Sequence, residues 1–142
     1  MRGAGPIGYP GGAEVVNMRP PSYLLEKDIH SLPCIGDGRQ SGTSGSPSIL
    51  NASPEAADGG GLALIQNNDV VRVDLTNFTV NVLVDETELN LRREQIDNSF
   101  LRPESQTPWQ DIFREKVNPF SEGMTLKGAE KHKNIAARHV PL

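Results

Sequence analysis

Two glycine-rich segments of the chain carry the residue types that could do chemistry. Residues 3–14 end on the carboxylate of Glu14, and residues 34–48 interleave glycine with hydroxyl side chains and contain Arg39. A carboxylate over a closely approaching backbone can ligate a divalent cation. Hydroxyls and backbone amides beside a guanidinium can hold an oxyanion or the carboxylate of a substrate. Plain structural interpretations stay open, with Glu14 as a solvated carboxylate at a helix start and the hydroxyl loop as a turn.

Several familiar kinds of site are excluded by the same two segments. The first has no Gly-Lys-Ser/Thr triplet and no strand before it, so it is neither a P-loop nor a dinucleotide fingerprint. No Gly-x-Ser-x-Gly elbow surrounds Ser41 or Ser44, and no histidine is close to them in sequence. A serine nucleophile paired with histidine is therefore not supported.

The secondary structure that must position these segments is predicted to change after residue 61, from loops to strands and helices. Twelve of the fourteen glycines precede residue 62, which predicts a loop-rich first half. A flexible tail is the alternative there, and the apolar residues at 32–35 and 49–50 argue against it. Strands are predicted at residues 62–65, 70–75 and 79–84. The last two alternate apolar and polar residues, which favours an antiparallel hairpin of half-buried strands.

Helices are predicted beyond the hairpin. Asp85 can cap a helix that runs through Gln95, with Glu88 as its capping-box partner. Pro108 is placed to begin a second helix, whose apolar residues recur at helical spacing at 109, 112, 113 and 117. A third candidate at residues 123–138 is mostly charged, so we expect it to be peripheral.

Composition limits the class of protein. The 142 residues, 36% of them hydrophobic, suit one domain with a modest core, and the net charge of -4 argues against a nucleic-acid partner. Cys34 is the only cysteine, so this chain alone can form neither an internal disulfide nor a thiolate cluster. No apolar stretch of these 142 residues is long enough for a signal peptide or a membrane span. We expect an intracellular protein, cytoplasmic or mitochondrial, with no membrane partner.

The two glycine-rich segments together resemble the last two signature stretches of the dihydroxyacid and phosphogluconate dehydratase family. The resemblance rests on residues 2–14 and 34–46 and continues through residues 53–57 and 59–64, the hairpin and residues 105–110. The version of the loop at residues 40–46, Gln-Ser-Gly-Thr-Ser-Gly-Ser, is similar to the sugar-acid branch of that family.

The resemblance implies an α+β fold and a domain division. Residues 1–100 would form a β-barrel-like swivelling β/β/α domain with glycine-rich active-site loops, and residues 101–142 a peripheral C-terminal helical extension. A larger N-terminal dehydratase domain would supply an iron-sulfur cluster and most of a Mg²⁺ site. The complete enzyme, a homo-oligomer, would be a hydro-lyase that dehydrates a pentonate-like sugar acid to its 2-keto-3-deoxy acid.

Three site residues follow from the resemblance. Ser41 matches the proposed base, Thr43 the hydroxyl that assists it, and Glu14 a carboxylate ligand of Mg²⁺. Cys34 lies outside the cluster-ligand motifs, so we expect a small buried residue at a strand. With one cysteine and one metal ligand, the isolated chain is expected to be inactive.

The alternative function is a truncated, non-catalytic remnant that serves only as a binding or interaction module. Met1 occupies a position that is usually internal in the family, which favours an incomplete chain. Cluster cysteines encoded upstream in the same reading frame would indicate part of an enzyme, and their absence a remnant.

Overall fold

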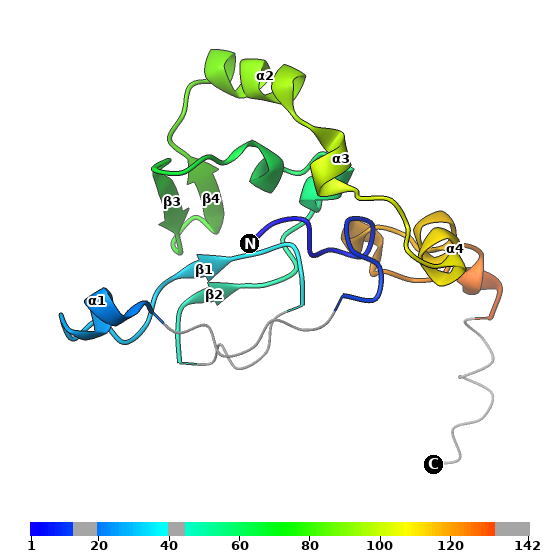
Figure 1. The fold of residues 1–142 in the computed structure, drawn as a ribbon, viewed down its shortest axis with the longest axis horizontal. Helices are drawn as coiled ribbons and strands as arrows, with labels where there is room; N and C mark the ends of the chain where they lie inside the picture. The colour runs from blue at the N-terminus through cyan, green and yellow to red at the C-terminus, as the bar shows by residue number, and fades with distance from the viewer. Residues whose placement is uncertain (13–19, 40–44, 133–142) are drawn as a thin grey trace.

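The computed structural model describes residues 1–12, 20–39 and 45–132 (Figure 1). These residues form short helices and strands, which confirms the mixed class predicted from the sequence. They contain two separate two-stranded sheets and no closed barrel, so the β-barrel-like form expected for residues 1–100 is not confirmed. In chain order the elements are α1 (Ser22–Leu25), β1 (Cys34–Ile35), β2 (Ser48–Ile49), η1 (Ala56–Asp58), η2 (Gly61–Leu64), β3 (Val71–Asp74), β4 (Thr79–Val82), α2 (Glu86–Gln95), α3 (Asn98–Leu101), α4 (Pro108–Lys116), η3 (Phe120–Glu122) and η4 (Ala129–His132).

Strands β1 and β2 pair in parallel at the two ends of the hydroxyl-rich segment. Cys34 lies opposite Ser48 and Ile35 opposite Ile49. The Sγ atom of Cys34 is 3.0 Å from the Oγ atom of Ser48. Cys34 is half-buried at this strand, so its position at a strand is as expected, while its burial is incomplete.

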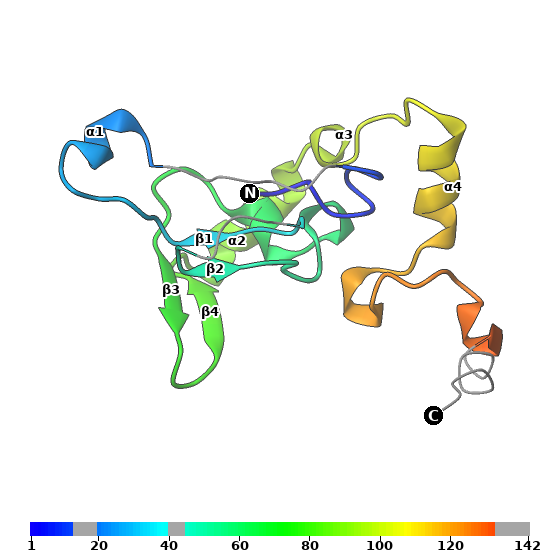
Figure 2. The same ribbon diagram turned by 90° about the horizontal axis from the view of Figure 1, so that it is seen from below.

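Strands β3 and β4 form the predicted antiparallel hairpin, with Val71 opposite Val82. Its turn is closed by Asp74, whose carboxylate accepts hydrogen bonds from the backbone amides of Thr76 and Asn77 at 2.9 Å. The expected half-burial is mostly absent, because within the two strands only Val71, Asp74 and Val82 are half-buried. Figure 2 shows the hairpin projecting away from the other elements.

The strand predicted at residues 62–65 is wrong, since this stretch is the 3₁₀ turn η2. The guanidinium of Arg2 explains the difference. Its Nη1 atom donates to the carbonyl oxygens of Ala63 at 3.0 Å and Ile65 at 2.7 Å. In an extended strand, successive carbonyls point to opposite sides, whereas the tight turn directs several of them toward one cation.

Helix α2 begins as predicted, because the Oδ1 atom of Asp85 accepts a hydrogen bond from the amide of Glu88 at 3.0 Å. The capping box is not completed, because the carboxylate of Glu88 accepts instead from Arg92, one turn further on, at 2.7 Å. Arg92 also donates to Asp69 at 2.5 Å and to the carbonyl of Leu64 at 3.1 Å. The hydrogen bond from Arg92 lowers the pKa of Asp69. The half-buried side chain of Arg92 thus connects α2 to η2.

Helix α4 begins at Pro108, as predicted, and Thr107 caps it. The prediction of a third helix is wrong for residues 123–128, which are not helical. Gly123 and Gly128 both have φ near 79°, a left-handed conformation that ends helices. Only the 3₁₀ turn η4 follows among the described residues.

The small core lies where η1, η2 and α3 meet. Ala56, Ala63 and Leu101 are buried together there, and Ala57, Leu62 and Ile96 pack around them. Leu101 is the first residue of the predicted C-terminal extension, yet it packs against the first 100 residues. Among the described residues, no helix is long and apolar enough to cross a membrane.

Candidate functional site

Asp37 fastens the start of the glycine-rich segment to the end of β1. Its carboxylate is 0% exposed and accepts hydrogen bonds from the amides of Gly3 at 2.9 Å, Ala4 at 3.1 Å and Ala56 at 2.8 Å. Glycine is needed at position 38, because a Cβ there would lie 2.7 Å from the Cβ of Ala4. The two glycine-rich segments are therefore in direct contact near their starts.

Glu55 holds the next turn of the same segment. Its side chain is 1% exposed, and its oxygens accept hydrogen bonds from the amides of Ile7 and Gly8, each at 3.0 Å. Burial raises the pKa of the Glu55 carboxyl, although the two amide donors act in the opposite direction. A Cβ at position 5 would lie 2.1 Å from Oε2 of Glu55, so only glycine allows this approach.

The opposite edge of the turn meets helix α4. Arg114 donates to the carbonyls of Ile7 at 2.9 Å and Gly8 at 3.1 Å, and Gln110 donates to the carbonyl of Pro10 at 3.3 Å. In Figure 1 the blue N-terminal turn lies beside the yellow helix α4. A segment without regular secondary structure is thus fixed from two sides.

Arg39 makes a second contact between the two segments, near the end of the first one. Its Nη2 atom donates to the carbonyl of Gly12 at 3.1 Å. Gly12 immediately precedes residues 13–19, which contain Glu14, and Arg39 immediately precedes residues 40–44, which contain Ser41 and Thr43. Glu14, Ser41 and Thr43 themselves lie outside the described residues. The structure therefore brings together the points from which both candidate stretches depart.

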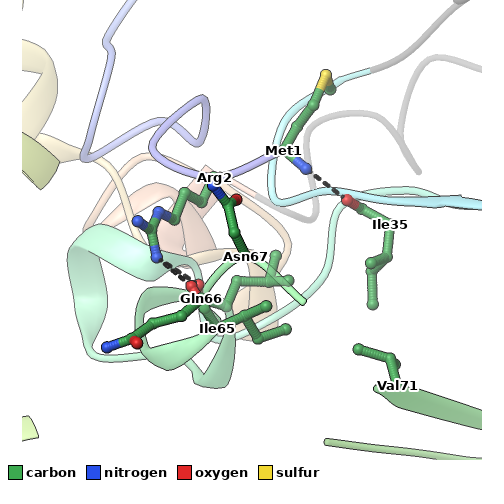
Figure 3. Close-up of a pocket in the computed structure, with 8 residues that line it drawn as sticks. Met1, Arg2, Ile35, Ile65, Gln66, Asn67 and Val71 are labelled. Atoms are coloured by element: carbon green, nitrogen blue, oxygen red, sulfur yellow. Dashed lines mark hydrogen bonds between the residues drawn. The ribbon is translucent and has the colours of Figure 1, made fainter. Parts of the chain in front are cut away.

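A small hollow adjoins this junction, with a volume of about 200 Å³. Tyr9, Phe113 and Phe120 give it aromatic walls, and Arg39 contributes the one guanidinium among its lining residues. A second pocket lies on the side of Arg2 (Figure 3). There the guanidinium points at the carbonyl of Ile65, and the amino group of Met1 donates to the carbonyl of Ile35 at 2.8 Å.

A metal or cluster site does not form from the described residues. Within residues 1–12, 20–39 and 45–132, no three His, Cys, Asp or Glu side chains gather as ligands would. Asp37 and Glu55 are buried, and their oxygens accept main-chain hydrogen bonds, so in this structure both carboxylates hold the turn. Glu14 remains the one metal ligand expected from the glycine-rich segments.

Sequence reasoning missed three residues that build the site: Asp37, Glu55 and Arg114. The first two carried a usable signal, because each is a lone acid next to glycine, proline or alanine in a stretch with few other charges. Arg114 carried none, since its acceptors lie more than a hundred residues earlier in the chain.

The chain belongs to the dihydroxy-acid/6-phosphogluconate dehydratase family. The family model described as its C-terminal part matches residues 1–124, which include both glycine-rich segments and helix α4. The resemblance inferred from the sequence is therefore confirmed.

Three curated relatives are named for sugar acids. The D-xylonate dehydratase of Caulobacter vibrioides is 51% identical over 97% of this chain and 23% of its own length. The L-arabinonate dehydratase of Rhizobium leguminosarum bv. trifolii and the 6-deoxy-6-sulfo-D-gluconate dehydratase of Pseudomonas putida are each 42% identical. They match 65% and 66% of this chain, and 16% of their own lengths. The chain thus spans less than a quarter of each of these relatives.

Proposed function

We propose that this chain is the C-terminal part of a hydro-lyase that dehydrates a pentonate-like sugar acid to its 2-keto-3-deoxy acid. The observation that carries the proposal is the hydrogen bond between Arg39 and Gly12, which joins the segments of Ser41 and Glu14. The names of the relatives support the substrate class, and the 51% identity to a D-xylonate dehydratase favours a pentonate.

Within the reaction, this chain would act on the proton at C2 of the substrate. Ser41 would take that proton, and the hydroxyl at C3 would leave as water, so that the resulting enol rearranges to the 2-keto acid. A serine hydroxyl is a very weak acid, so it needs cations and aligned donors to act as a base. Thr43 would donate a hydrogen bond to the Ser41 oxygen, and loop amides beside the glycines would favour its charged form.

The rest of the enzyme would supply what this chain lacks. When bound, Mg²⁺ and an iron-sulfur cluster would provide the Lewis acids for the substrate carboxylate and the departing hydroxyl. We assign Glu14 as a Mg²⁺ ligand, the other ligands and the cluster to the N-terminal domain, and a homo-oligomeric state to the complete enzyme.

The test of Ser41 is proton exchange in the complete dehydratase. Ser41→Ala should lower the exchange of the C2 proton with heavy water by at least about a hundredfold while the substrate still binds. Ser121→Ala is the matched control, because it removes an exposed hydroxyl in η3 that belongs to neither segment. Exchange at the wild-type rate in the Ser41 variant would remove this residue from the mechanism.

A further inference from the structure

The peptide units at Ile7 and Gly8 are held by opposite charges on their two edges. Their N–H groups donate to the carboxylate of Glu55, and their carbonyls accept from the guanidinium of Arg114. Glu55 is fully buried and Arg114 is half-buried. A buried charge held by main-chain dipoles is well ordered, because moving away would leave it without partners.

Arg114 is suited to this contact by the shape of its side chain. Its Nε atom binds the carbonyl of Ile7, Nη2 binds the carbonyl of Gly8, and Nη1 donates to the Oγ atom of Ser105 at 2.7 Å. All three nitrogens of the planar fork thus have separate acceptors, which a lysine ammonium on a flexible stem cannot reproduce. Among the described residues, Arg114 forms no ion pair that would compete for its donors.

Gln110 extends the contact along the same face of α4, one turn before Arg114. Its Nε2 atom donates to the carbonyl of Pro10, and its Oε1 atom accepts from the amide of Gln106 at 2.6 Å. The second bond fixes the direction of the side-chain amide. Residues four apart on a helix lie on one face, so Gln110 and Arg114 can both bind carbonyls of the N-terminal turn.

We propose that Arg114 is a positioning residue of the dehydratase site. It sets the glycine turn from which the Glu14 segment departs and which Arg39 joins to the Ser41 segment. This inference rests on the proposed function for its catalytic consequence. The helix predicted as a peripheral extension would thereby determine where the candidate carboxylate and serine stand relative to each other, since small misplacements of catalytic groups lower rates strongly.

The test uses the complete dehydratase and two readouts. Arg114→Ala should speed amide hydrogen exchange at Ile7 and Gly8 about tenfold or more, and lower kcat/KM by about 10- to 100-fold. Millimolar guanidinium should restore both quantities, because it can enter the space that the side chain leaves. Lys116→Ala is the matched control, because Lys116 is an exposed cation on the same helix whose side chain pairs with its neighbour Glu115.

Arg114→Lys serves as the second variant in case the alanine variant does not fold. It keeps the charge and loses the fork, so we expect a smaller change in the same direction for both readouts. Unchanged exchange at Ile7 and Gly8 would overturn the contact itself. Faster exchange with unchanged kcat/KM would overturn the positioning role. If the wild-type enzyme dehydrates no sugar acid, the proposed function fails, while the exchange measurement still decides whether Arg114 holds the turn.

Discussion

The N-terminal turn and the β3–β4 hairpin represent opposite ways of ordering a segment. Residues 3–12 have no regular secondary structure, yet Gly5, Pro6, Gly8 and Pro10 are buried, and distant charged side chains bind the backbone. The hairpin has regular strands, yet Leu75 is 80% exposed. Regular hydrogen bonding and fixed position in the fold are therefore separate properties in this chain.

The difference has a physical cause in the kind of contact each region makes. The turn is held by hydrogen bonds to buried charges, which are directional and leave few alternative arrangements. The hairpin is stabilised by the hydrogen bonds between its strands and by the apolar contacts of its valines. An isolated two-stranded hairpin is only marginally stable in water. Single substitutions of polar residues should therefore lower the stability of the turn, and similar substitutions in the hairpin should change stability little.

The largest expected effect is that of Asp37→Ala in the complete dehydratase. The substitution removes the acceptor of three amides, and each buried donor left unsatisfied costs about 1–3 kcal/mol. We expect a lower thermal midpoint and a fall in kcat/KM of about two orders of magnitude. Asp111→Ala, an exposed acid on α4, is the control. An unchanged midpoint would mean that the turn does not depend on Asp37.

A smaller effect is expected from Glu55→Gln, with a characteristic pH dependence. Burial raises the pKa of Glu55, and the charges of Asp37 and Asp58 act in the same direction. The folded protein therefore keeps this proton to a higher pH than the unfolded chain, whose carboxyl titrates near 4.5. Stability contributed by the protonated form is present below that value and is lost as pH rises through the folded pKa.

Thermal midpoints of the wild type and Glu55→Gln, compared between about pH 4 and 7, measure this dependence. The wild type should lose stability relative to the variant as pH rises, since the variant does not titrate at this position. Glu104→Gln, an exposed acid, should show no such trend. A difference that moves the opposite way would show that the amides of Ile7 and Gly8 outweigh burial.

The smallest effect is expected at the tip of the hairpin, where Phe78 is 94% exposed with φ near 53°. Asparagine adopts this left-handed conformation more easily than phenylalanine. Phe78→Asn should therefore change the unfolding free energy by less than about 0.5 kcal/mol. A large fall in the thermal midpoint of the complete enzyme would show that Phe78 is buried by parts of the protein beyond this chain. The hairpin would then be fixed in position by contacts, as the N-terminal turn is.

The features predicted correctly from the sequence depend on neighbouring residues. The cap at Asp85, the start of α4 at Pro108 and the antiparallel pairing of the hairpin each involve residues that are close together in the sequence. The stretch 62–65 was mistaken for a strand because Arg2, about sixty residues earlier, gathers its carbonyls. Local pattern contains no information about such a partner.

In the candidate site, too, the features visible in a local stretch of sequence were predicted and the distant partners were not. Glycines and hydroxyls identified both segments, because a loop that approaches a ligand closely needs those residue types. The groups that hold the segments were not identified, since Asp37 and Glu55 reach their amides across 34 and 48 residues. Whether Glu14, Ser41 and Thr43 meet as the family resemblance implies stays a prediction.

The span between Ile7 and Arg114 also sets an order of events during synthesis on the ribosome. Their contact joins positions 107 residues apart, so at about 5–20 residues per second the first turn is made roughly 5–20 seconds before its last partner. Asp37 and Glu55 emerge earlier and can hold the amide edge of the turn during that interval. The carbonyl edge has to wait for α4, so a nascent chain that stops before residue 114 carries a half-fastened site.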